Sequence, residues 1–592
     1  MAPILDRRRP AFAAALFTRA GLAWAVICAL LLVTDFNAIA ASRFPDPDDI
    51  MRLLQVQDLL AGQSWFDVTQ YRVDAVSGGV PMHWSRLVDI PLAAVIAVLS
   101  LFMNSAAAQA AAAVIVPLVT LGCALLLAGR IAWRLIGEEA AGFACLAMAL
   151  SVPLISHMRP LRIDHHGWQI VLALLAVNAL MARNARAGGW MIGIVLALWV
   201  SISIEGLPLA AAVCGLVALR WLRDRRSRDW FVYTMASLGI TSVLLFGLTR
   251  GFSDLAQHCD AISPVHLTIF VWGGAAAWLL ARCEPIPRGA VVCAMGLIAA
   301  GAGAIMYFAA PQCAGGGFAA LDPLVAKYWY QGVGEGLPVW KQTPGLALQI
   351  MVPPLIALAA ALQLARSTSD WLRQWWYEYA LLLMAALIVA MFVARAGAVA
   401  GALASVPLGW QISQWIRNAR NMRRPGRRAL ALASVALALM PAMPLTLLAI
   451  AMPARASLNT SLVQTSSCAI PQSAGALRAL PKGEILAPLD LGPLLLYETN
   501  HSVIATGHHR GDQGMRAVIE MFTGSAQSAR TALRARAASY IVICPDLIEP
   551  ARYVDAAPDG FMAQLLAGDE PAWLEPVMVP GEGNMQIWKI AP

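Results

Sequence analysis

The sequence predicts an α-helical polytopic membrane protein that carries an α/β domain at its C-terminal end. Hydrophobic residues make up 59% of the 592 residues and charged residues only 13%, and the mean hydropathy is +0.64. Apolar runs of about 20 residues, the length that crosses a bilayer, recur between Gly21 and Ala451. The formal net charge is +8, but the basic residues gather in short clusters between apolar runs. This placement favours cytoplasmic loops over a nucleic-acid partner.

The basic clusters set the predicted topology, because cytoplasmic loops carry an excess of Lys and Arg. The clusters lie at residues 1–10, 129–134, 183–186, 220–230, 282–288, 365–374 and 417–428. Placing all of them in the cytoplasm predicts about thirteen spans, with the N-terminus inside and the C-terminus outside. The predicted spans are residues 14–40, 106–130, 138–157, 167–183, 188–204, 206–221, 230–249, 266–282, 288–310, 346–366, 376–394, 400–416 and 428–452.

Residues 90–104 are apolar, but their length of about 15 residues is short for a span. We interpret them as an interfacial or re-entrant helix, because counting them as a span would place Asp164, His165 and His166 in the cytoplasm. The resulting plan is a transmembrane domain over residues 1–452 and an outer α/β domain over residues 453–592. Its outer loops are residues 41–105, 250–266 and 311–345.

Cysteine placement agrees with this sidedness. Cys259 and Cys313 fall in two outer loops and Cys468 and Cys544 in the tail, whereas the other cysteines lie in or beside apolar spans. An oxidising compartment would pair them as Cys259–Cys313 and Cys468–Cys544. Free buried thiols are the alternative.

Two acidic clusters from separate helices lie on the predicted outer side. Asp46, Asp48 and Asp49 crowd the end of the first span, and Asp164 and His166 precede the fourth. Asp46 or Asp48 together with Asp164 and His166 would give an oxygen and nitrogen site suited to Mn or Mg. The alternative for each cluster is structural, as the cap of the helix that follows it.

Two further ionisable residues, Glu335 in GVGEGLPVW and Arg395 in MFVARAG, lie at predicted outer helix ends. Either alone could lie there without a function. Together with the span plan, the acidic first loop and the DHH at 164–166, they resemble the catalytic subunit of oligosaccharyltransferases, within the C-type glycosyltransferases (GT-C). GVGEGLPVW is similar to the family's S-V-S-E-x-x-P-T-x-W with one residue deleted before Trp340, and archaeal members carry the DHH. The resemblance covers nearly the whole chain and implies the GT-C fold.

The resemblance implies a role for each of these residues. Asp46 or Asp48, Asp164 and His166 would bind the metal, Glu335 would contact the metal or the acceptor, and Arg395 would bind the donor's phosphate. Which acid of the first outer loop corresponds to the family's metal ligand stays open. Asp46 has the family's spacing of six residues to an Arg, here Arg52, whereas Asp48 has the family's spacing to a second acid, here Asp58. The candidate catalytic carboxylates, one of which would accept the acceptor's proton, are Asp46, Asp48, Asp49 and Glu335.

The tail departs from the family. The W-W-D-Y-G motif, which recognises the hydroxyl residue of an acceptor sequon, is reduced to Asp490 and Gly492 in PLDLG, so we expect a different acceptor pocket. GHHRGDQG offers His508, His509 and Arg510 as acceptor-side contacts, with a polar surface turn as the alternative. EILAPL, SVIAT and SYIVIC are predicted strands, and residues 517–537 a predicted helix. WWYEYA at 375–380 is predicted to form an interfacial aromatic belt.

The function implied by the resemblance is transfer, with inversion, of a glycan from a polyprenyl-linked donor in the membrane lipid to a periplasmic protein or glycan. The location implied is the bacterial inner membrane, with the C-terminal domain in the periplasm. Transfer of a single sugar from a polyprenyl monophosphate is a second interpretation. A lipid or solute transporter, or a non-catalytic relative, is a third, but charge is scarce inside the predicted spans, which argues against transport.

The charge asymmetry predicts the side of the membrane on which each loop lies. Reporter fusions at Ser85, Gly336 and Pro592 should be active in the periplasm, and a fusion at Arg225 should be active in the cytoplasm. A cysteine placed at residue 165 that reacts only with cytoplasmic label would contradict the thirteen-span plan.

Overall fold

The computed structural model describes residues 13–252, 254–451, 466–468, 470–579 and 583–591. The basic stretch at 1–10, the predicted domain junction at 452–453 and Pro592 lie outside the described residues. The chain forms two compact units. Unit 1 comprises residues 1–40, 85–317 and 334–452, and unit 2 comprises residues 41–84, 318–333 and 453–592. Unit 2 therefore contains two segments that the sequence assigned to loops of the helical domain.

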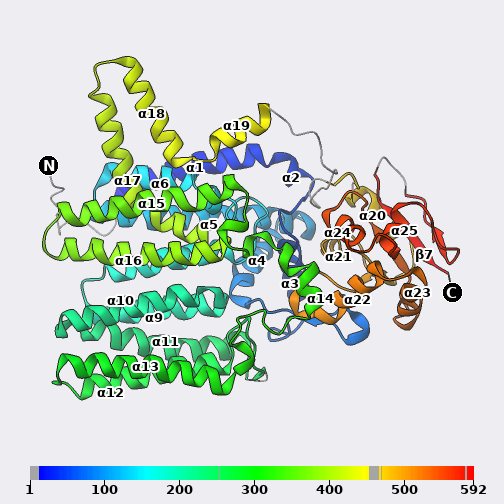
Figure 1. Cartoon of the computed structure of the whole chain (residues 1–592), viewed down its shortest axis with the longest axis horizontal. Coiled ribbons are helices and arrows are strands. Elements are labelled where there is room, and N and C mark those ends of the chain that lie inside the picture. The colour runs from blue at the N-terminus through cyan, green and yellow to red at the C-terminus, as the bar shows by residue number, and fades with distance from the viewer. Residues whose placement is uncertain (1–12, 253, 452–465, 469, 580–582, 592) are drawn as a thin grey trace. The chain divides into compact units, whose positions relative to one another are not determined.

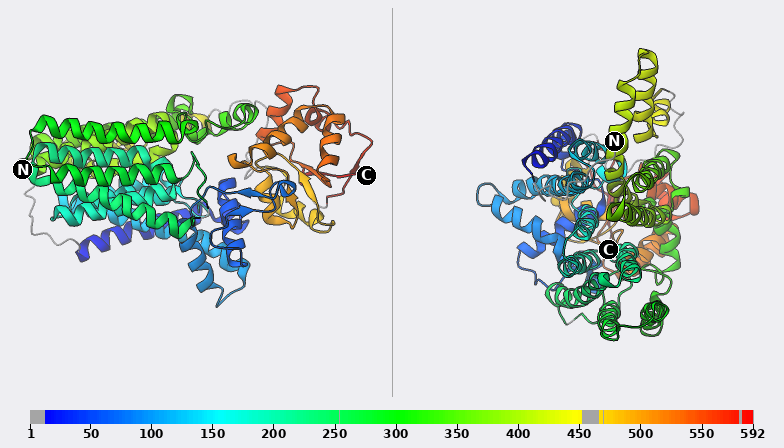
Figure 2. Two further views of the ribbon diagram at one scale, coloured as in Figure 1. Left: turned by 90° about the horizontal axis from the view of Figure 1, so that it is seen from below. Right: turned by 90° about the vertical axis from the view of Figure 1, so that its left-hand side faces the viewer.

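Unit 1 is a bundle of long apolar helices that run side by side (Figures 1 and 2). Nine helical segments of the described residues are long and apolar enough to cross a membrane, and all nine coincide with predicted spans. They are Ala14–Thr34 (α1), Ser105–Leu135 (α5), Ala185–Ile202 (α9), Ile204–Arg223 (η2 and α10), Arg225–Thr249 (η3 and α11), Pro264–Arg282 (α12), Arg288–Ala309 (α13), Pro344–Ser367 (α15) and Asp370–Phe392 (α16).

The other predicted spans are helical too, but shorter, broken or more polar. They are Glu138–Ala149 (α6) with Val152–Ile155 (α7), His166–Leu180 (α8), Gly397–Arg420 (α17), and Pro425–Leu439 (α18) with Met443–Ala451 (α19). The first predicted span ends early, and Phe36–Ala40 forms a separate α2. The apolar segment near residue 90 forms α4 (Arg86–Leu99), a 14-residue helix that contains a buried ion pair between Arg86 and Asp89.

Helices α9 and α11 are in close backbone contact because of two glycines on one face of α9. A Cβ on Gly193 would lie 2.5 Å from the Thr234 carbonyl oxygen, and one on Gly189 would lie 2.9 Å from the Trp230 carbonyl oxygen. The Ser237 hydroxyl donates to the Trp190 carbonyl across the same interface, at 2.9 Å. Small residues four positions apart allow membrane helices to approach this closely.

The aromatic residues near the start of α16 correct one sequence prediction. Trp375, Trp376 and Tyr379 are buried in the bundle instead of forming an interfacial belt. The Tyr379 hydroxyl donates to the Leu403 carbonyl at 2.5 Å, and the two Trp rings pack edge to face. The Tyr379 hydroxyl is thus hydrogen-bonded although it is buried, and the two large Trp rings fill space between helices.

Unit 2 is built on a mixed five-stranded sheet in the order β4-β3-β5-β7-β6. Strand β3 (Glu484–Leu486) is parallel to β4 (Ser502–Val503) and β5 (Tyr540–Ile543), whereas β7 (Gln586–Ile590) is antiparallel to β5 and to β6 (Leu574–Pro576). The helices of the tail are α20 (Ile470–Arg478), α21 (Gly492–Glu498), η10 (His509–Gly511), α22 (Asp512–Thr523), α23 (Ala526–Ala535), α24 (Ile548–Ala556) and α25 (Phe561–Leu566). Strands β3, β4 and β5 fall where the sequence predicts them.

The segment 41–84 joins the edge of this sheet. It contains α3 (Pro47–Leu60), a two-stranded ribbon of β1 (Thr69–Gln70) and β2 (Val80–Pro81), and η1 (Ala75–Ser77). Val73 forms a parallel bridge with Val503 of β4, whose N–H donates to the Arg72 carbonyl at 2.9 Å. The segment 318–333 adds α14 (Pro323–Tyr328) and η5 (Tyr330–Gly332) to the same unit.

The single helix predicted over 517–537 is two helices, α22 and α23. Gly524 ends the first, and Ser525 caps the second by accepting the N–H of Ser528 at 3.2 Å. Serine at a helix start satisfies an N–H that has no intrahelical partner. The local sequence therefore contained a start signal inside the predicted helix.

The four cysteines assigned to disulfides are joined in the two expected pairs. Cys259 pairs with Cys313 within unit 1, and Cys468 pairs with Cys544 within unit 2. The second bridge connects the segment before α20 to the residue that follows β5. The other six cysteines are free thiols.

The close contact between α9 and α11 predicts opposite effects for two glycine substitutions. Gly193→Ala should destabilise the protein by about 1–3 kcal/mol, because its methyl group would overlap backbone atoms that cannot move aside. Gly296→Ala on α13, where a Cβ would meet no atom within 4 Å, should be neutral or slightly stabilising. Thermal unfolding of the two detergent-purified variants measures the difference, and equal midpoints would contradict the packing argument.

Candidate functional site

The DHH at 164–166 forms a compact cluster at the start of α8. The helix begins at His166 with His165 as its N-cap residue, so Asp164 lies one position before the cap. The Asp164 carboxylate lies 2.6 Å from His165 Nδ1 and 3.3 Å from His166 Nε2. All three side chains are buried, although each can carry a charge. Such groups are costly at a membrane boundary unless they are paired.

Glu335 connects this cluster to two arginines. It lies in the short 3₁₀ helix Gly334–Gly336 (η6), with Oε1 3.7 Å from His166 Nε2 and 3.3 Å from an Arg395 nitrogen. Its Oε2 lies 3.4 Å from Arg162. Both carboxylate oxygens therefore face cations or an imidazole nitrogen. The structure brings together Asp164 and His166 of the DHH stretch, Glu335 of GVGEGLPVW and Arg395 of MFVARAG, which come from three separate parts of the sequence.

Residues outside the predicted set complete the cluster. Glu205 in η2 (Ile204–Gly206) pairs with Arg395 at 2.5 Å and accepts from the Gln169 amide at 3.2 Å. Trp199 donates to the Gln169 oxygen at 3.2 Å, which fixes the amide. Glu205 was visible in the sequence as a rare charge near an outer helix end, and Arg162 as one of the basic residues beside DHH. Their partners lie far away along the chain, so neither could be assigned a role.

The pairing sets the charge of two groups in the cluster. Burial opposes a charge on His165, but Asp164 and Glu205 beside it raise its pKa to about 9. Burial would likewise raise the pKa of Glu335, but His166, Arg395 and Arg162 hold that pKa well below its usual range. At neutral pH, His165 is protonated and Glu335 is ionised.

The donor set of this cluster fits a divalent cation. His157, His166 and Glu335 have ligand atoms that lie within 4.8 Å of one another, as do Asp164, His165 and His166. Of these, His165 in its protonated form has no lone pair for a metal, so the candidate ligands are Asp164, His157, His166 and Glu335. His166 belongs to both groups, and its Nε2 faces one carboxylate oxygen of Asp164 and one of Glu335. Imidazole nitrogen with carboxylate oxygen suits Zn or Mn, and carboxylate oxygen suits Mg.

The predicted loop-one acids lie in unit 2. Asp46 caps α3, because its side chain accepts the Asp48 N–H at 3.0 Å, and Asp49 is buried in the first turn. The structural alternative from the sequence thus holds for Asp46. Metal ligation by Asp46 or Asp48 stays a prediction.

The acceptor-side candidates also lie in unit 2. Glu549 accepts the N–H groups of Leu489 and Asp490, at 2.7 and 3.0 Å, and so fixes the PLDLG loop. A Cβ on Gly492 would lie 2.7 Å from the Ala505 carbonyl, so this glycine allows close packing. The GHHRGDQG stretch is not simply a surface turn. It forms η10 and the start of α22, and its His508 is buried.

No protein-family model and no curated protein matches this sequence. Solved structures of the oligosaccharyltransferase of Archaeoglobus fulgidus are similar. The form tethered to an acceptor peptide containing the NVT sequon gives a TM-score of 0.65 at 14% identity over 98% of this chain and 74% of that chain. The same enzyme, AglB, in complex with an inhibitory peptide and a dolichol-phosphate gives 0.64 at 13% over 95% and 72%. The complex with Zn and sulfate gives 0.62 at 14% over 93% and 70%. These likenesses confirm the predicted oligosaccharyltransferase-like membrane fold.

Proposed function

We propose that this protein is an integral membrane glycosyltransferase that moves a glycan from a polyprenyl-phosphate or polyprenyl-diphosphate donor to an acceptor on the outer face of the membrane. The observation that carries the proposal is the convergence of Asp164, His166 and Glu335 with Arg395 and Arg162 in one cluster at helix ends. The fold is that of an archaeal oligosaccharyltransferase solved with a dolichol-phosphate. Acidic and imidazole donors beside two guanidinium groups suit a reaction that separates a sugar from a phosphate.

The donor's phosphate would bind at the two arginines. Arg395 contacts Glu205 and Glu335, and Arg162 contacts Glu335, so both guanidinium groups are held in place by carboxylates. A guanidinium that is already oriented loses less conformational entropy when it binds a phosphate oxygen. Arg395 and Arg162 would stabilise the negative charge that develops on the leaving phosphate.

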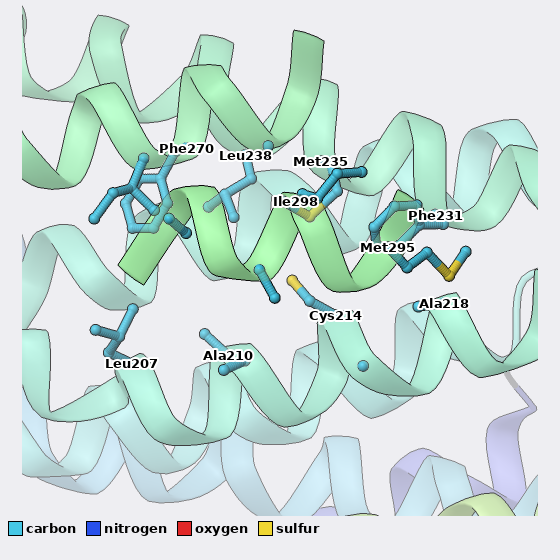
Figure 3. Close-up of a pocket in the computed structure, with 16 residues that line it drawn as sticks. Leu207, Ala210, Cys214, Ala218, Phe231, Met235, Leu238, Phe270, Met295 and Ile298 are labelled. Atoms are coloured by element: carbon cyan, nitrogen blue, oxygen red, sulfur yellow. The ribbon is translucent and has the colours of Figure 1, made fainter. Parts of the chain in front are cut away.

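The donor's polyprenyl chain would lie in an apolar cavity between α10, α11, α12 and α13 (Figure 3). The cavity has a volume of about 360 Å³, and its lining includes Leu207, Cys214, Phe231 and Phe270. Leu207 begins α10 and is two residues beyond Glu205, the partner of Arg395. An apolar chain held there would place its phosphate end toward the ionic cluster.

The metal would be held by Asp164, His166 and Glu335. When bound, a divalent ion such as Mn or Mg would neutralise charge on the leaving phosphate. Zn and sulfate are bound in the structure of the archaeal enzyme. The donor set here accommodates that ion as well as Mn or Mg.

The acceptor's proton would pass to a carboxylate other than Glu335. Both oxygens of Glu335 already face positive or hydrogen-bonding partners, which lowers their basicity. Asp46, Asp48 and Asp49 remain the sequence-based candidates for this base, and the Asp46 side chain caps α3. A hydroxyl acceptor fits this arrangement more simply than an amide, since an amide nitrogen needs additional activation.

Asp164→Asn tests the proposed function directly. The substitution removes a metal ligand but keeps the size of the side chain, so we expect normal folded yield and loss of transfer by more than about 100-fold. A deletion strain should accumulate a lipid-linked glycan and lack glycosylated products, as measured by mass spectrometry. Reintroducing the wild-type gene should remove the accumulated glycan and restore the glycosylated products, whereas a gene carrying Asp164→Asn should do neither. Full activity that remains EDTA-sensitive in purified Asp164→Asn would rule out the metal assignment, and a single-sugar lipid would favour the monophosphate donor.

Arg395→Ala should separate donor binding from metal binding. Its assigned partner is phosphate, so the apparent KM for the lipid donor should rise by about 10-fold or more while the affinity for Mn²⁺ is unchanged. Arg186→Ala is the matched control, because Arg186 lies outside the cluster, where it pairs with Asp229 and lies over the Tyr233 ring. An unchanged donor KM in Arg395→Ala would contradict the phosphate assignment.

A further inference from the structure

Three histidines of unit 2 form a cluster that the proposed reaction does not use. His83 follows β2, and His508 and His509 lie at the start of η10, 425 residues away from His83 along the chain. The His83 ring lies 5.0 Å from that of His508 and 4.9 Å from that of His509, and the two neighbours lie 4.9 Å apart. Each offers a ring nitrogen within 4.8 Å of the others.

The contact between two of these rings indicates that at least one of the two imidazoles is neutral. His83 Nδ1 lies 2.8 Å from His508 Nε2, which is hydrogen-bonding distance. One of the two nitrogens must then accept with a lone pair, because a protonated imidazole has only donors. A neutral ring nitrogen is also the form that ligates a transition metal.

The spacing of the ring nitrogens suits a tetrahedral ion. With Zn–N distances of about 2.0–2.1 Å, neighbouring ligand nitrogens lie about 3.3 Å apart. The distance between His83 Nδ1 and His508 Nε2 would increase slightly from 2.8 Å. The His509 ring nitrogen, which lies within 4.8 Å of the other two, would move closer to them. Rotation about side-chain bonds is enough for both changes, so the backbone can stay in place.

The backbone that carries the cluster is fixed by local contacts. An Arg510 guanidinium nitrogen donates to the Met82 carbonyl at 3.4 Å. A Cβ on Gly511 would lie 3.1 Å from a methyl group of Val80, so η10 packs closely on β2. The ring of Trp84 is buried and packs edge to face on His508, 5.2 Å away. Pre-organised ligands lose less entropy when they bind an ion.

We propose that His83, His508 and His509 bind Zn²⁺ through one ring nitrogen each and leave the fourth position open to water or another ligand. Three imidazoles favour Zn²⁺ over Mg²⁺ or Ca²⁺, which prefer oxygen ligands. The ion would replace the hydrogen bond between His83 and His508, and the ring protons would reside on the opposite nitrogens. It would join the segment 41–84 to the C-terminal segment within unit 2.

The test is the metal content of the full chain. The protein is purified in detergent with a tag that contains no histidine, stripped with chelator, equilibrated with Zn²⁺ and desalted. Mass spectrometry of the metal should find about one Zn²⁺ per chain fewer in His83→Gln and His509→Gln than in the wild type. His258→Gln, at a histidine that pairs with Asp254 outside the cluster, should keep the wild-type content. Asp164→Asn should also keep the Zn²⁺ of the cluster, so failure of the proposed reaction would be distinguishable from failure of this site.

Co²⁺ provides a second readout that does not depend on stoichiometry. A three-nitrogen tetrahedral site should give visible absorption bands on addition of Co²⁺, and these should be lost in His83→Gln and His509→Gln and retained in Asp164→Asn. Both substituted histidines are half-buried, so folding is expected to survive and is checked by monodisperse elution. Equal Zn²⁺ content and equal Co²⁺ spectra in the wild type and both variants would overturn the proposal.

Discussion

The ionic cluster around Glu335 is the interaction on which the rest of the helical unit depends. Glu335 contacts His166 at the start of α8, Arg395 between α16 and α17, and Arg162 in the segment before α8. Glu205 extends the network to the start of α10. Each group would be costly at a membrane boundary without its partners. The ends of several helices are therefore fixed relative to one another by charge pairing.

Apolar association contributes less to this arrangement than it would in a soluble protein. Lipid tails solvate leucine and alanine as well as a helix surface does, so close packing and hydrogen bonds must hold the helices together. The approach of Gly193 to the backbone of α11 and the bond from Ser237 to Trp190 are contacts of this kind. Helix α13 shows the opposite case. Val291 is its only buried residue, as expected for a helix whose surface faces lipid.

Sequence reasoning was most successful where one physical rule dominates. Span length and positive charge predicted the helices, because hydrocarbon thickness and the positive-inside rule act locally. Asp164, His166, Glu335 and Arg395 were found because they lie at predicted outer helix ends and the motifs around them resemble those of a known family. Glu205 and Arg162 were missed as members because their partners lie far along the chain. Trp375 and Trp376 were misassigned because an aromatic residue near a helix end fits an interface and a buried helix contact equally well.

The tail was harder to predict because its elements are short. Strand β4 has two residues, and β6 and β7 at the C-terminus follow no strong alternation. The grouping of residues 41–84 with the tail depends on a bridge at Val73 and Val503 and on hydrogen bonds from a single edge strand. No local pattern signals a pairing over such a distance. For the same reason His83 could not be associated with His508 and His509.

Under the proposed function, the donor and acceptor sides of the reaction are constrained to different degrees. Any polyprenyl-linked donor presents a phosphate and an apolar chain, which require cations, a metal and an apolar cavity whatever the sugar. An acceptor is recognised by specific hydrogen bonds that change with its identity. The two motif residues that the tail retains have structural reasons to be there. Gly492 lets the chain pass close to the Ala505 carbonyl, and the backbone N–H of Asp490 is held by Glu549. Their presence therefore does not argue for sequon recognition, and the acceptor must be sought by its chemistry and not by the motif.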